Sequence, residues 1–251
     1  MIELTNISRH FSMGDQTVKA LDGVSLTINS GEYISLMGPS GSGKSSLLNL
    51  IGLLDTANAG RYLFDGQDTT NMEDRKLADL RGRYIGFVFQ SFHLIPRLSA
   101  ADNVMMPMTL AGIDIDQRRQ RVAQLLERFG LTDRAGHKPN ELSGGQRQRV
   151  AIARAMVMQP SLILADEPTG NLDQNSGKEV VEQLEALNQD GITLVVVTHD
   201  SNLGQRAHRQ INLVDGRIVA DSGLTEPTEP SAELVSSSPP NPNGAGDHVL
   251  A

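Results

Sequence analysis

A chain of 251 residues with a formal net charge of -8 and no cysteine is long enough for one full-sized α/β domain and a small inserted subdomain. Its acidic balance argues against a nucleic-acid-binding surface, and the absence of cysteine excludes disulfides and thiolate metal sites and fits a reducing compartment. Because no run approaches the roughly 18–20 apolar residues of a membrane span and the N-terminus lacks a signal-peptide pattern, we expect a soluble, cytoplasmic protein.

The N-terminal part of the chain is predicted to form short strands around a glycine-rich loop. The segments "IELTNI" (2–7) and "VSLTI" (24–28) alternate apolar and polar residues, as half-buried strands do. The apolar run "YISLM" (33–37) precedes the loop, and the loop leads into the helical pattern "KSSLLNLIGLL" (44–54). "GRYLFDGQD" (60–68) predicts a strand with an Asp-Gly turn.

The middle of the chain is predicted to be mostly helical. "IGFVFQ" (85–90) is a strand that ends in a polar residue, and helical patterns continue from there to about residue 160. At 117–129 a single apolar stripe is formed by Val122, Leu125, Leu126 and Phe129. This pattern is typical of an amphipathic helix packed on a core.

The C-terminal part alternates strands and helices. "LILAD" (162–166) and "TLVVVT" (193–198) are nearly continuous apolar runs, separated by a helix near 175–189. Strands of this composition are buried on both faces, which indicates a parallel sheet flanked by helices. Residues 222–251 hold five of the eleven prolines and show no periodicity, so we predict a disordered tail there.

"GPSGSGKSS" (38–46) fits the phosphate-loop pattern G-x-x-x-x-G-K-[ST]. In this pattern glycines let backbone N–H groups curl around phosphate, Lys44 reaches the β and γ oxygens, and the Ser45 hydroxyl ligates Mg²⁺. A flexible Gly/Ser turn is the alternative, but the loop lies between a buried strand and a helix, as the mechanism requires. The candidate ligands are Gly38, Pro39, Ser40, Gly41, Ser42, Gly43, Lys44, Ser45 and Ser46.

"LILADEP" supplies the acidic residues that a phosphate loop requires as partners. Asp166 closes a buried strand and is placed to hold the water shell of a metal ion. Glu167 follows it and is placed to orient or deprotonate an attacking water. The alternative is that these residues only end a strand and begin a loop. Because the phosphate loop precedes them, we favour the catalytic interpretation.

A second candidate anion site lies in "NELSGGQRQRVAIARA" (140–155). Ser143 and Gln146 have the spacing of a helix capping box. The turn between them is Gly144-Gly145, although each glycine costs a helix roughly 0.5–1 kcal/mol relative to alanine. Bare N–H groups at a helix start bind anions, so the chain contains two predicted phosphate sites about a hundred residues apart.

In order along the chain come the phosphate loop, "LSGGQ" (142–146), "LILADEP", "NLD" (171–173) and a histidine after "LVVVT". With this combination the chain resembles the ATP-binding subunit of an ABC transporter over about residues 1–221, and "LSGGQ" is that family's own signature. The resemblance implies an α/β fold of the P-loop NTPase, ABC type. Its expected parts are a parallel core sheet, an antiparallel β subdomain and an inserted α-helical subdomain at about residues 91–160.

The resemblance also implies catalytic roles. Glu167 would be the catalytic base, and His199 would contact the γ-phosphate. Gln90 would contact Mg²⁺ and water and relay to the membrane domain. The implied cofactors are ATP and Mg²⁺, with metal ligands Ser45, Gln90 and Asp166. Two alternatives remain open: Gln90 as an ordinary strand-end polar group, and His199-Asp200 as a helix cap.

Further nucleotide contacts follow from the same resemblance. Phe11 falls where the family places an aromatic residue, usually tyrosine, stacked on adenine; the alternative is a core residue. Asp173 belongs to the loop that crosses the dimer interface. The helix beginning at Ser143 would aim its N-terminus at the γ-phosphate held by another copy, and its positive end favours that anion. The implied ligands there are Ser143, Gly144, Gly145 and Gln146, so two chains would sandwich two ATP molecules.

"FVFQSFHLIPRLSAADNV" and "LADEPTGNLD" resemble the subgroup that contains MacB-like exporters and LolD-like lipoprotein-release machines. In that subgroup the ATPase pairs with a four-span membrane subunit that has a periplasmic domain, in some cases with a periplasmic adaptor. We therefore expect a homodimer on the cytoplasmic, inner face of the cell membrane, and no nucleic acid partner. Met105, Met106 and Met108 lie in the segment expected near the membrane subunit; a binding surface and a buried core are equally open for them.

Two other functions are alternatives to transport. A non-transport ABC ATPase, in envelope signalling or acting on DNA or ribosomes, would share every motif above. DNA-repair members have long coiled coils between the phosphate loop and the signature, whereas this chain has only a compact helical stretch. A P-loop GTPase or small-molecule kinase would leave "LSGGQ" unexplained, and the chain has no [NT]KxD guanine motif. The extended tail is either a partner-binding arm or a passive extension.

Overall fold

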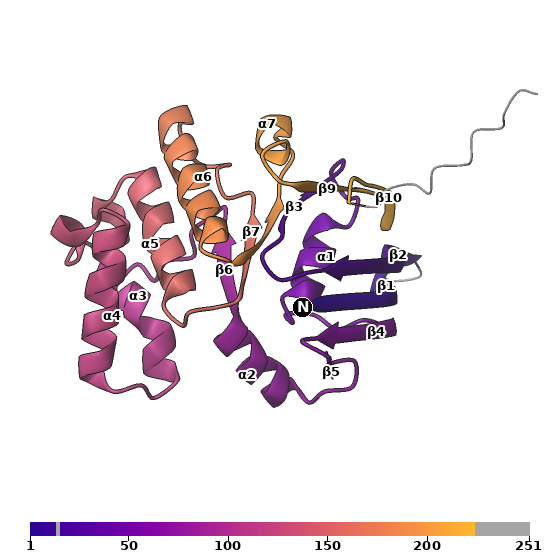
Figure 1. Cartoon of the computed structure of the whole chain (residues 1–251), viewed down its shortest axis with the longest axis horizontal. Coiled ribbons are helices and arrows are strands. Elements are labelled where there is room, and N and C mark those ends of the chain that lie inside the picture. Colours follow the sequence, from indigo (N-terminus) through magenta and orange to yellow (C-terminus); the bar gives the residue numbers. More distant parts are fainter. Residues whose placement is uncertain (14–15, 224–251) are drawn as a thin grey trace, which may run out of the picture.

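The computed structural model describes residues 1–13 and 16–223. These residues form two sheets with helices around them (Figure 1). The predicted tail, 222–251, falls outside the described residues from 224 onward. No helix within the described residues combines the length and apolar character needed to cross a bilayer.

The smaller sheet is antiparallel and contains the N-terminal strands. Its order is β2-β1-β4-β5, with β1 at Ile2–Met13, β2 at Gln16–Ile28, β4 at Ala59–Phe64 and β5 at Gln67–Asp68. The expected Asp-Gly turn joins β4 to β5, with φ of 47° at Asp65 and 76° at Gly66. Positive φ at both residues is the requirement of the tightest hairpin turns.

The larger sheet forms the centre of the molecule. Its order is β10-β9-β3-β8-β7-β6, and every neighbouring pair is parallel except β9 with β10. The strands are β3 (Tyr33–Met37), β6 (Ile85–Phe89), β7 (Leu162–Asp166), β8 (Thr193–Val197), β9 (Arg209–Val214) and β10 (Arg217–Asp221). The predicted parallel sheet is therefore confirmed, with an antiparallel hairpin at one edge.

Both faces of the larger sheet are buried. In β7, Leu162 and Leu164 pack with α1 (Lys44–Ile51) and the antiparallel sheet. Ile163 and Ala165 point to the opposite face and pack with helices α3 to α6. Successive side chains of a strand alternate between faces, so an apolar run is required where both faces are covered.

Three helices lie between β6 and β7 and occupy the end of the molecule opposite the antiparallel sheet (Figure 1). They are α3 (Ala100–Leu110), α4 (Ile115–Arg128) and α5 (Gly144–Met156), with short 3₁₀ turns at Thr132–Arg134 and Pro139–Glu141. The amphipathic helix predicted at 117–129 is α4, and its stripe is buried at Val122 and Leu126. In α3, Met108 is fully buried while Met105 and Met106 are partly buried.

The remaining helices are α2 (Asp74–Tyr84), α6 (Gln174–Gln189) and the short α7 (Ser201–Gly204). Helix α1 ends at Ile51, three residues before the end of the predicted helical pattern. The reason is local: Leu53 has a left-handed φ of 54°, which a helix cannot contain. Gly52 also lies directly against the Phe87 ring, where a side chain would collide.

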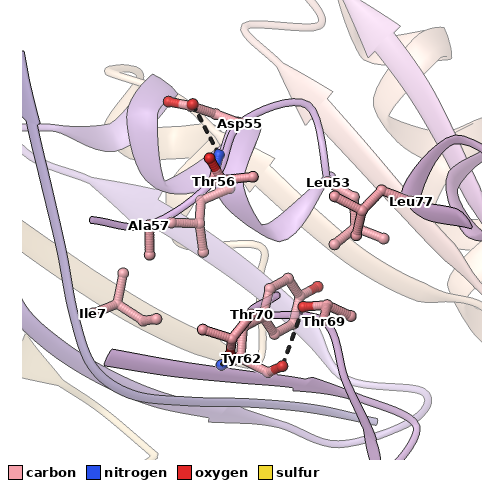
Figure 2. A pocket seen from close by; sticks show the side chains of 10 residues that line it. Ile7, Leu53, Asp55, Thr56, Ala57, Tyr62, Thr69, Thr70 and Leu77 are labelled. Atoms are coloured by element: carbon pink, nitrogen blue, oxygen red, sulfur yellow. Dashed lines mark hydrogen bonds between the residues drawn. The ribbon is translucent and has the colours of Figure 1, made fainter. Parts of the chain in front are cut away.

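A small cavity lies where the turn after α1 meets β4 and α2 (Figure 2). Its volume of about 20 Å³ is that of a single water site. Thr69 donates its hydroxyl to the Tyr62 carbonyl beside it, and Asp55 accepts the N–H of Thr56 at 2.8 Å. The cavity is too small for a substrate, so this corner is a structural joint between the antiparallel sheet, α1 and α2.

Close packing of β6 on α5 predicts a steric effect at Gly86. A Cβ there would lie 2.6 Å from the Ala155 carbonyl oxygen and 3.2 Å from its Cβ. We expect Gly86→Ala to lower the free energy of unfolding by about 1–3 kcal/mol. The matched control is Gly82→Ala in exposed α2, where nothing lies within 4 Å and alanine should gain roughly 0.5–1 kcal/mol. Urea titration measures both, and a neutral Gly86→Ala would contradict the packing.

Candidate nucleotide site

A cleft of 530 Å³ opens between the loop after β3, the β1–β2 hairpin and the ends of β7 and β8. Residues far apart in the sequence, from Phe11 to His199, line this cleft. Those predicted from the sequence are Phe11, Ser40, Gly41, Gly43, Lys44, Ser45, Ser46, Asp166, Glu167 and His199. The carboxyl ends of parallel strands meet at one edge of a sheet, and ligands of open α/β sheets bind there.

The loop at 38–46 requires glycine because of its backbone. Gly38 has φ of 141° and Gly43 has φ of 100°. A Cβ at Gly38 would overlap the Leu213 carbonyl oxygen of β9, and one at Gly43 would overlap the Ala20 carbonyl oxygen of β2. The loop is therefore held between both sheets, and no other residue fits at these two positions.

Helix α1 begins at Lys44 with its N–H groups directed at the loop. Gly43 is the residue before it and supplies no side-chain cap. Lys44 extends its ammonium across the loop and donates to the carbonyls of Gly38 and Pro39, both at 2.8 Å. The Ser42 hydroxyl is buried without a hydrogen-bond partner among the described residues. Uncapped N–H groups beside a lysine form an anion site.

Asp166 lies at the last position of β7 and is half-buried. Burial raises its pKa, the adjacent Glu167 charge raises it further, and the Lys44 ammonium opposes both. Asp166, the Ser45 hydroxyl and the Gln90 amide would present oxygen ligands, which suit Mg²⁺ when phosphates and water complete the shell. No cluster of three or more acidic or histidine ligands occurs in the described part of the chain, so the protein alone offers few ligands.

Glu167 has an unusual backbone and a well-fixed side chain. Its φ is 46°, and its N–H donates to the Val197 carbonyl at 2.9 Å. Its carboxylate accepts the backbone N–H of His199 at 3.1 Å and the ring Nδ1–H of the same residue at 2.7 Å. The buried Thr198 hydroxyl donates to the other carboxylate oxygen at 3.4 Å. The carboxylate is therefore held against the end of β8.

Gln90 follows β6 directly but is not part of the cleft lining. Its amide donates to the Asn171 side chain at 3.5 Å, and Asn171 donates back to the Gln90 carbonyl at 3.0 Å. Gly170 is in close contact with the same amide. No local sequence pattern indicates this pairing, because it depends on how β6 and β7 lie beside each other.

Ser143 and Gln146 form the predicted capping box at the start of α5. The Gln146 N–H donates to the Ser143 hydroxyl oxygen at 3.2 Å, and the Ser143 N–H donates to the Gln146 side chain at 2.9 Å. The hydroxyl oxygen is thus engaged rather than bare. The N–H groups of Gly144 and Gly145 have no partner within residues 1–13 and 16–223.

The glycines of this turn also have a packing role that no sequence motif indicates. A Cβ at Gly145 would lie 2.9 Å from the Ser176 side chain of α6, and one at Gly144 would lie 3.3 Å from Leu172. Asp173 caps α6 by accepting the N–H groups of Asn175 and Ser176, and the hydrogen bond from Ser176 lowers its pKa. Close packing of the start of α5 therefore gives a structural reason for glycine at these positions, although glycine destabilises a helix.

The start of α5 and the cleft are separate within one chain. None of the residues from Ser143 to Gln146 lines the cleft, and Asp173 lines a neighbouring surface groove instead. The remaining predicted residue, Phe11, is 37% exposed at the cleft's edge, so it is not a core residue. Val18, Lys19, Ala20 and Val197 also line the cleft; the sequence does not indicate them, because hairpin pairing brings them there.

The fold and this cleft define a P-loop nucleoside triphosphatase, with a glycine-rich loop, a lysine and a strand-end acidic pair in one place. A sequence profile of the ABC transporter family matches residues 21–170. The chain belongs to the ABC transporter family of ATPases.

Relatives of this chain are similar over most of its length. YknY of Bacillus subtilis, an uncharacterized ABC transporter ATP-binding protein, is 50% identical, and the alignment covers 89% of this chain and 97% of YknY. The macrolide export ATP-binding/permease protein MacB 1 of Yersinia pestis bv. Antiqua is 48% identical over 97% of this chain. This chain spans only 38% of the length of that MacB.

Solved structures agree with the fold. The dimeric ATP-binding cassette MJ0796, bound to ADP and Pi, is 44% identical with a TM-score of 0.82, covering 88% of this chain and 97% of the other. CbiO1 from Clostridium perfringens, part of the ABC transporter complex cbiONQ, is 28% identical with a TM-score of 0.78, covering 88% and 87%. The predicted fold class is confirmed.

The contact between Glu167 and His199 predicts a titration behaviour. The hydrogen bond and the charge of Glu167 raise the pKa of His199 above its ordinary 6.5. The charged pair is therefore fully formed below pH 6.5, and its stabilisation is lost as the pH rises through the raised pKa. In Glu167→Gln we expect the pKa of His199 to fall back toward 6.5, as measured by NMR titration of the ring protons. An unchanged pKa would show that the pair does not exist in solution.

Proposed function

We propose that this chain is the ATP-hydrolysing subunit of an ABC export or lipoprotein-release type complex and acts as an ATP-dependent homodimer. The observation that supports this proposal is the separation of two helix starts with free N–H groups: the start of α1 lines the cleft, and the start of α5 at Ser143 does not. We further propose residues 1–221 as the ATP-binding domain, with its helical subdomain at about 91–160, and 222–251 as a tail.

The cleft supports hydrolysis by a positioned base. Glu167 would take the proton of a water as the water oxygen bonds to the γ-phosphorus and the bond to the ADP oxygen breaks. The His199 ring is already held at Nδ1 by that carboxylate, which leaves Nε2 as its polar atom for the γ-phosphate. Lys44 and the N–H groups of α1 would bind the phosphate oxygens, and Phe11 would stack on the base.

Mg²⁺ would be held by Ser45, Gln90 and Asp166 and would neutralise charge on the phosphates. Gln90 is hydrogen-bonded to Asn171 and does not line the cleft, so its amide would have to reach the ion from outside the cleft lining. Its position between the core and the helices α3 to α5 also suits the relay to a membrane subunit that we propose for it.

The dimer proposal explains why α5 has free N–H groups. Each chain would present Ser143, Gly144, Gly145 and Gln146 to the ATP of its partner, with Asp173 near the interface. MJ0796, the similar cassette, is dimeric in its complex with ADP and Pi. A helix start with unpaired N–H groups is unfavourable unless an anion or water meets it, and the partner's γ-phosphate would be that anion.

Mixing two inactive variants tests this arrangement. Lys44→Ala disables the cleft, and Ser143→Asp keeps a good helix cap but places a negative charge toward the partner's phosphate. Each homodimer should hydrolyse ATP at least 100-fold more slowly than wild type, because every site is defective. An equal mixture should regain hydrolysis well above either variant alone, since mixed dimers contain one intact site. Initial rates measured against mixing ratio provide the readout.

The matched control is Ser143→Asn, which caps the helix as well as aspartate but has no charge. It should retain most activity, so that a loss in Ser143→Asp reports repulsion rather than a damaged helix. Absence of recovery in mixtures that demonstrably contain mixed dimers would contradict the shared site.

We propose a separate four-span membrane subunit with a periplasmic domain as the partner, with a periplasmic adaptor as a further candidate. Support comes from MacB, which is named for macrolide export and carries ATP-binding and permease parts in a longer chain. The location would be the cytoplasmic face of the membrane. The alternative is a non-transport ABC ATPase in envelope signalling or on DNA or ribosomes, and the net charge of -8 disfavours a nucleic acid partner.

Affinity purification from detergent-solubilised membranes distinguishes these functions. We expect a tagged chain to co-purify with one four-span membrane protein in roughly equal amounts, and without nucleic acid. Nuclease-treated and untreated samples provide the comparison. Recovery with nucleic acid and never with a membrane protein would overturn the transport proposal.

A further inference from the structure

One face of the Phe11 ring is covered by a cation. Arg9 and Phe11 are two residues apart in β1, so their side chains point to the same side. The Arg9 guanidinium carbon lies 4.5 Å from the centre of the Phe11 ring. Phe11 lines the cleft, whereas Arg9 does not. Of this pair, the ring and not the guanidinium is therefore exposed to the cleft.

Arg9 is itself fixed by the turn that follows α1. Its Nε donates to Asp55 at 2.8 Å, and its Nη1 donates to the Asn58 side chain at 3.3 Å. Asp55 is held in turn by the N–H of Thr56, as Figure 2 shows. Asn58 also accepts the backbone N–H of His10 at 2.7 Å, next to Arg9 in β1. Two anchors thus hold the guanidinium in place.

These contacts connect the aromatic ring to the phosphate loop. Helix α1 begins at Lys44 in the loop and ends at Ile51, just before the turn that holds Arg9. The pairing between β1 and β2 is irregular at Arg9 and His10, and such bulges redirect side chains near sites. A series of contacts therefore connects the Phe11 ring to the phosphate loop: the ring contacts Arg9, Arg9 contacts Asp55, and Asp55 follows α1, which begins in the loop.

We propose that Arg9 is a positioning residue for the nucleotide base, through a three-layer stack of base, Phe11 ring and guanidinium. The inference rests on the proposed binding of a nucleotide in the cleft. A cation on one ring face is attracted by the ring electrons and immobilises the ring, so the other face meets the base without losing further freedom. A planar guanidinium stacks on a ring better than an ammonium does.

The other side chains at this end of the cleft do little to orient a base. Val18 and Ala20 are apolar, and Lys19 is an exposed cation 3.7 Å from Asp22. Stacking on Phe11 is then the main contribution of the base to affinity. Since stacking depends on a fixed ring, removal of Arg9 weakens binding of nucleotides and leaves binding of a base-free polyphosphate unchanged.

Isothermal titration calorimetry with two probes tests this on the full chain, in the presence of Mg²⁺: ADP, which has a base, and inorganic tripolyphosphate, which has none. We expect Arg9→Gln to weaken ADP binding roughly three- to ten-fold and to leave tripolyphosphate binding unchanged. Phe11→Leu should produce a similar selective loss. The double variant should bind ADP no more weakly than Phe11→Leu alone, because both residues act through one stack. Arg9→Lys should restore part of the affinity.

Two more variants separate positioning from folding. Asp55→Asn removes the charge of one of the two anchors of Arg9 and leaves both stacked residues in place, so it should weaken ADP binding selectively even if Arg9→Gln does not fold. Arg61→Gln is the matched control: it removes an exposed arginine of β4 that pairs with Asp68 at 2.7 Å, and should change neither probe.

The outcomes that overturn the inference differ from those that overturn the proposed function. Equal losses for ADP and tripolyphosphate, additive losses in the double variant, or unchanged ADP affinity in Arg9→Gln and Asp55→Asn would each overturn the role of Arg9. If the wild-type chain binds neither ADP nor tripolyphosphate, the proposed nucleotide site itself fails.

Discussion

The candidate site depends on the N–H groups at the start of α1. A helix start without a side-chain cap inside a folded protein requires an acceptor, and here the loop before it is bent by glycines whose places no larger residue can take. The parallel order of β3, β7 and β8 then brings the acidic pair and His199 to the same edge. The phosphate loop therefore determines where the anion lies, and the strand order determines which residues meet it.

The start of α5 follows the same principle with a different outcome. Its capping box satisfies part of the helix start, and close packing against α6 requires its glycines on steric grounds. The residues that carry the remaining N–H groups, Gly144 and Gly145, do not line the cleft of their own chain. In the dimer that we propose, one site combines the α1 start of one chain with the α5 start of the other, which would link nucleotide binding to association. Both helix starts need an acceptor for their free N–H groups. The start of α1 lines the cleft of its own chain, whereas the start of α5 does not.

Sequence motifs predicted those parts of the molecule that depend on local chemistry. The phosphate loop, the strand ending at Asp166 and the capping box at Ser143 each have a spacing that favours one local structure over its alternatives. Helix α2 was not anticipated, because it is mostly polar and buries only Leu77. The contacts of Asn171 with Gln90 and of Thr198 with Glu167 also escaped prediction. They join segments far apart in the chain, and their partners follow from strand order rather than from any local pattern.

The left-handed backbone at Glu167 has a consequence for how this protein can change. A non-glycine residue with positive φ stores strain of order 1–3 kcal/mol, and an asparagine or glycine would tolerate that conformation better. Random variation selected for heat resistance alone should therefore drift toward such residues at this position and discard the carboxylate. If Glu167 is the base that we propose, the chain keeps this carboxylate at a thermodynamic disadvantage, and stability and chemistry are opposed at this position.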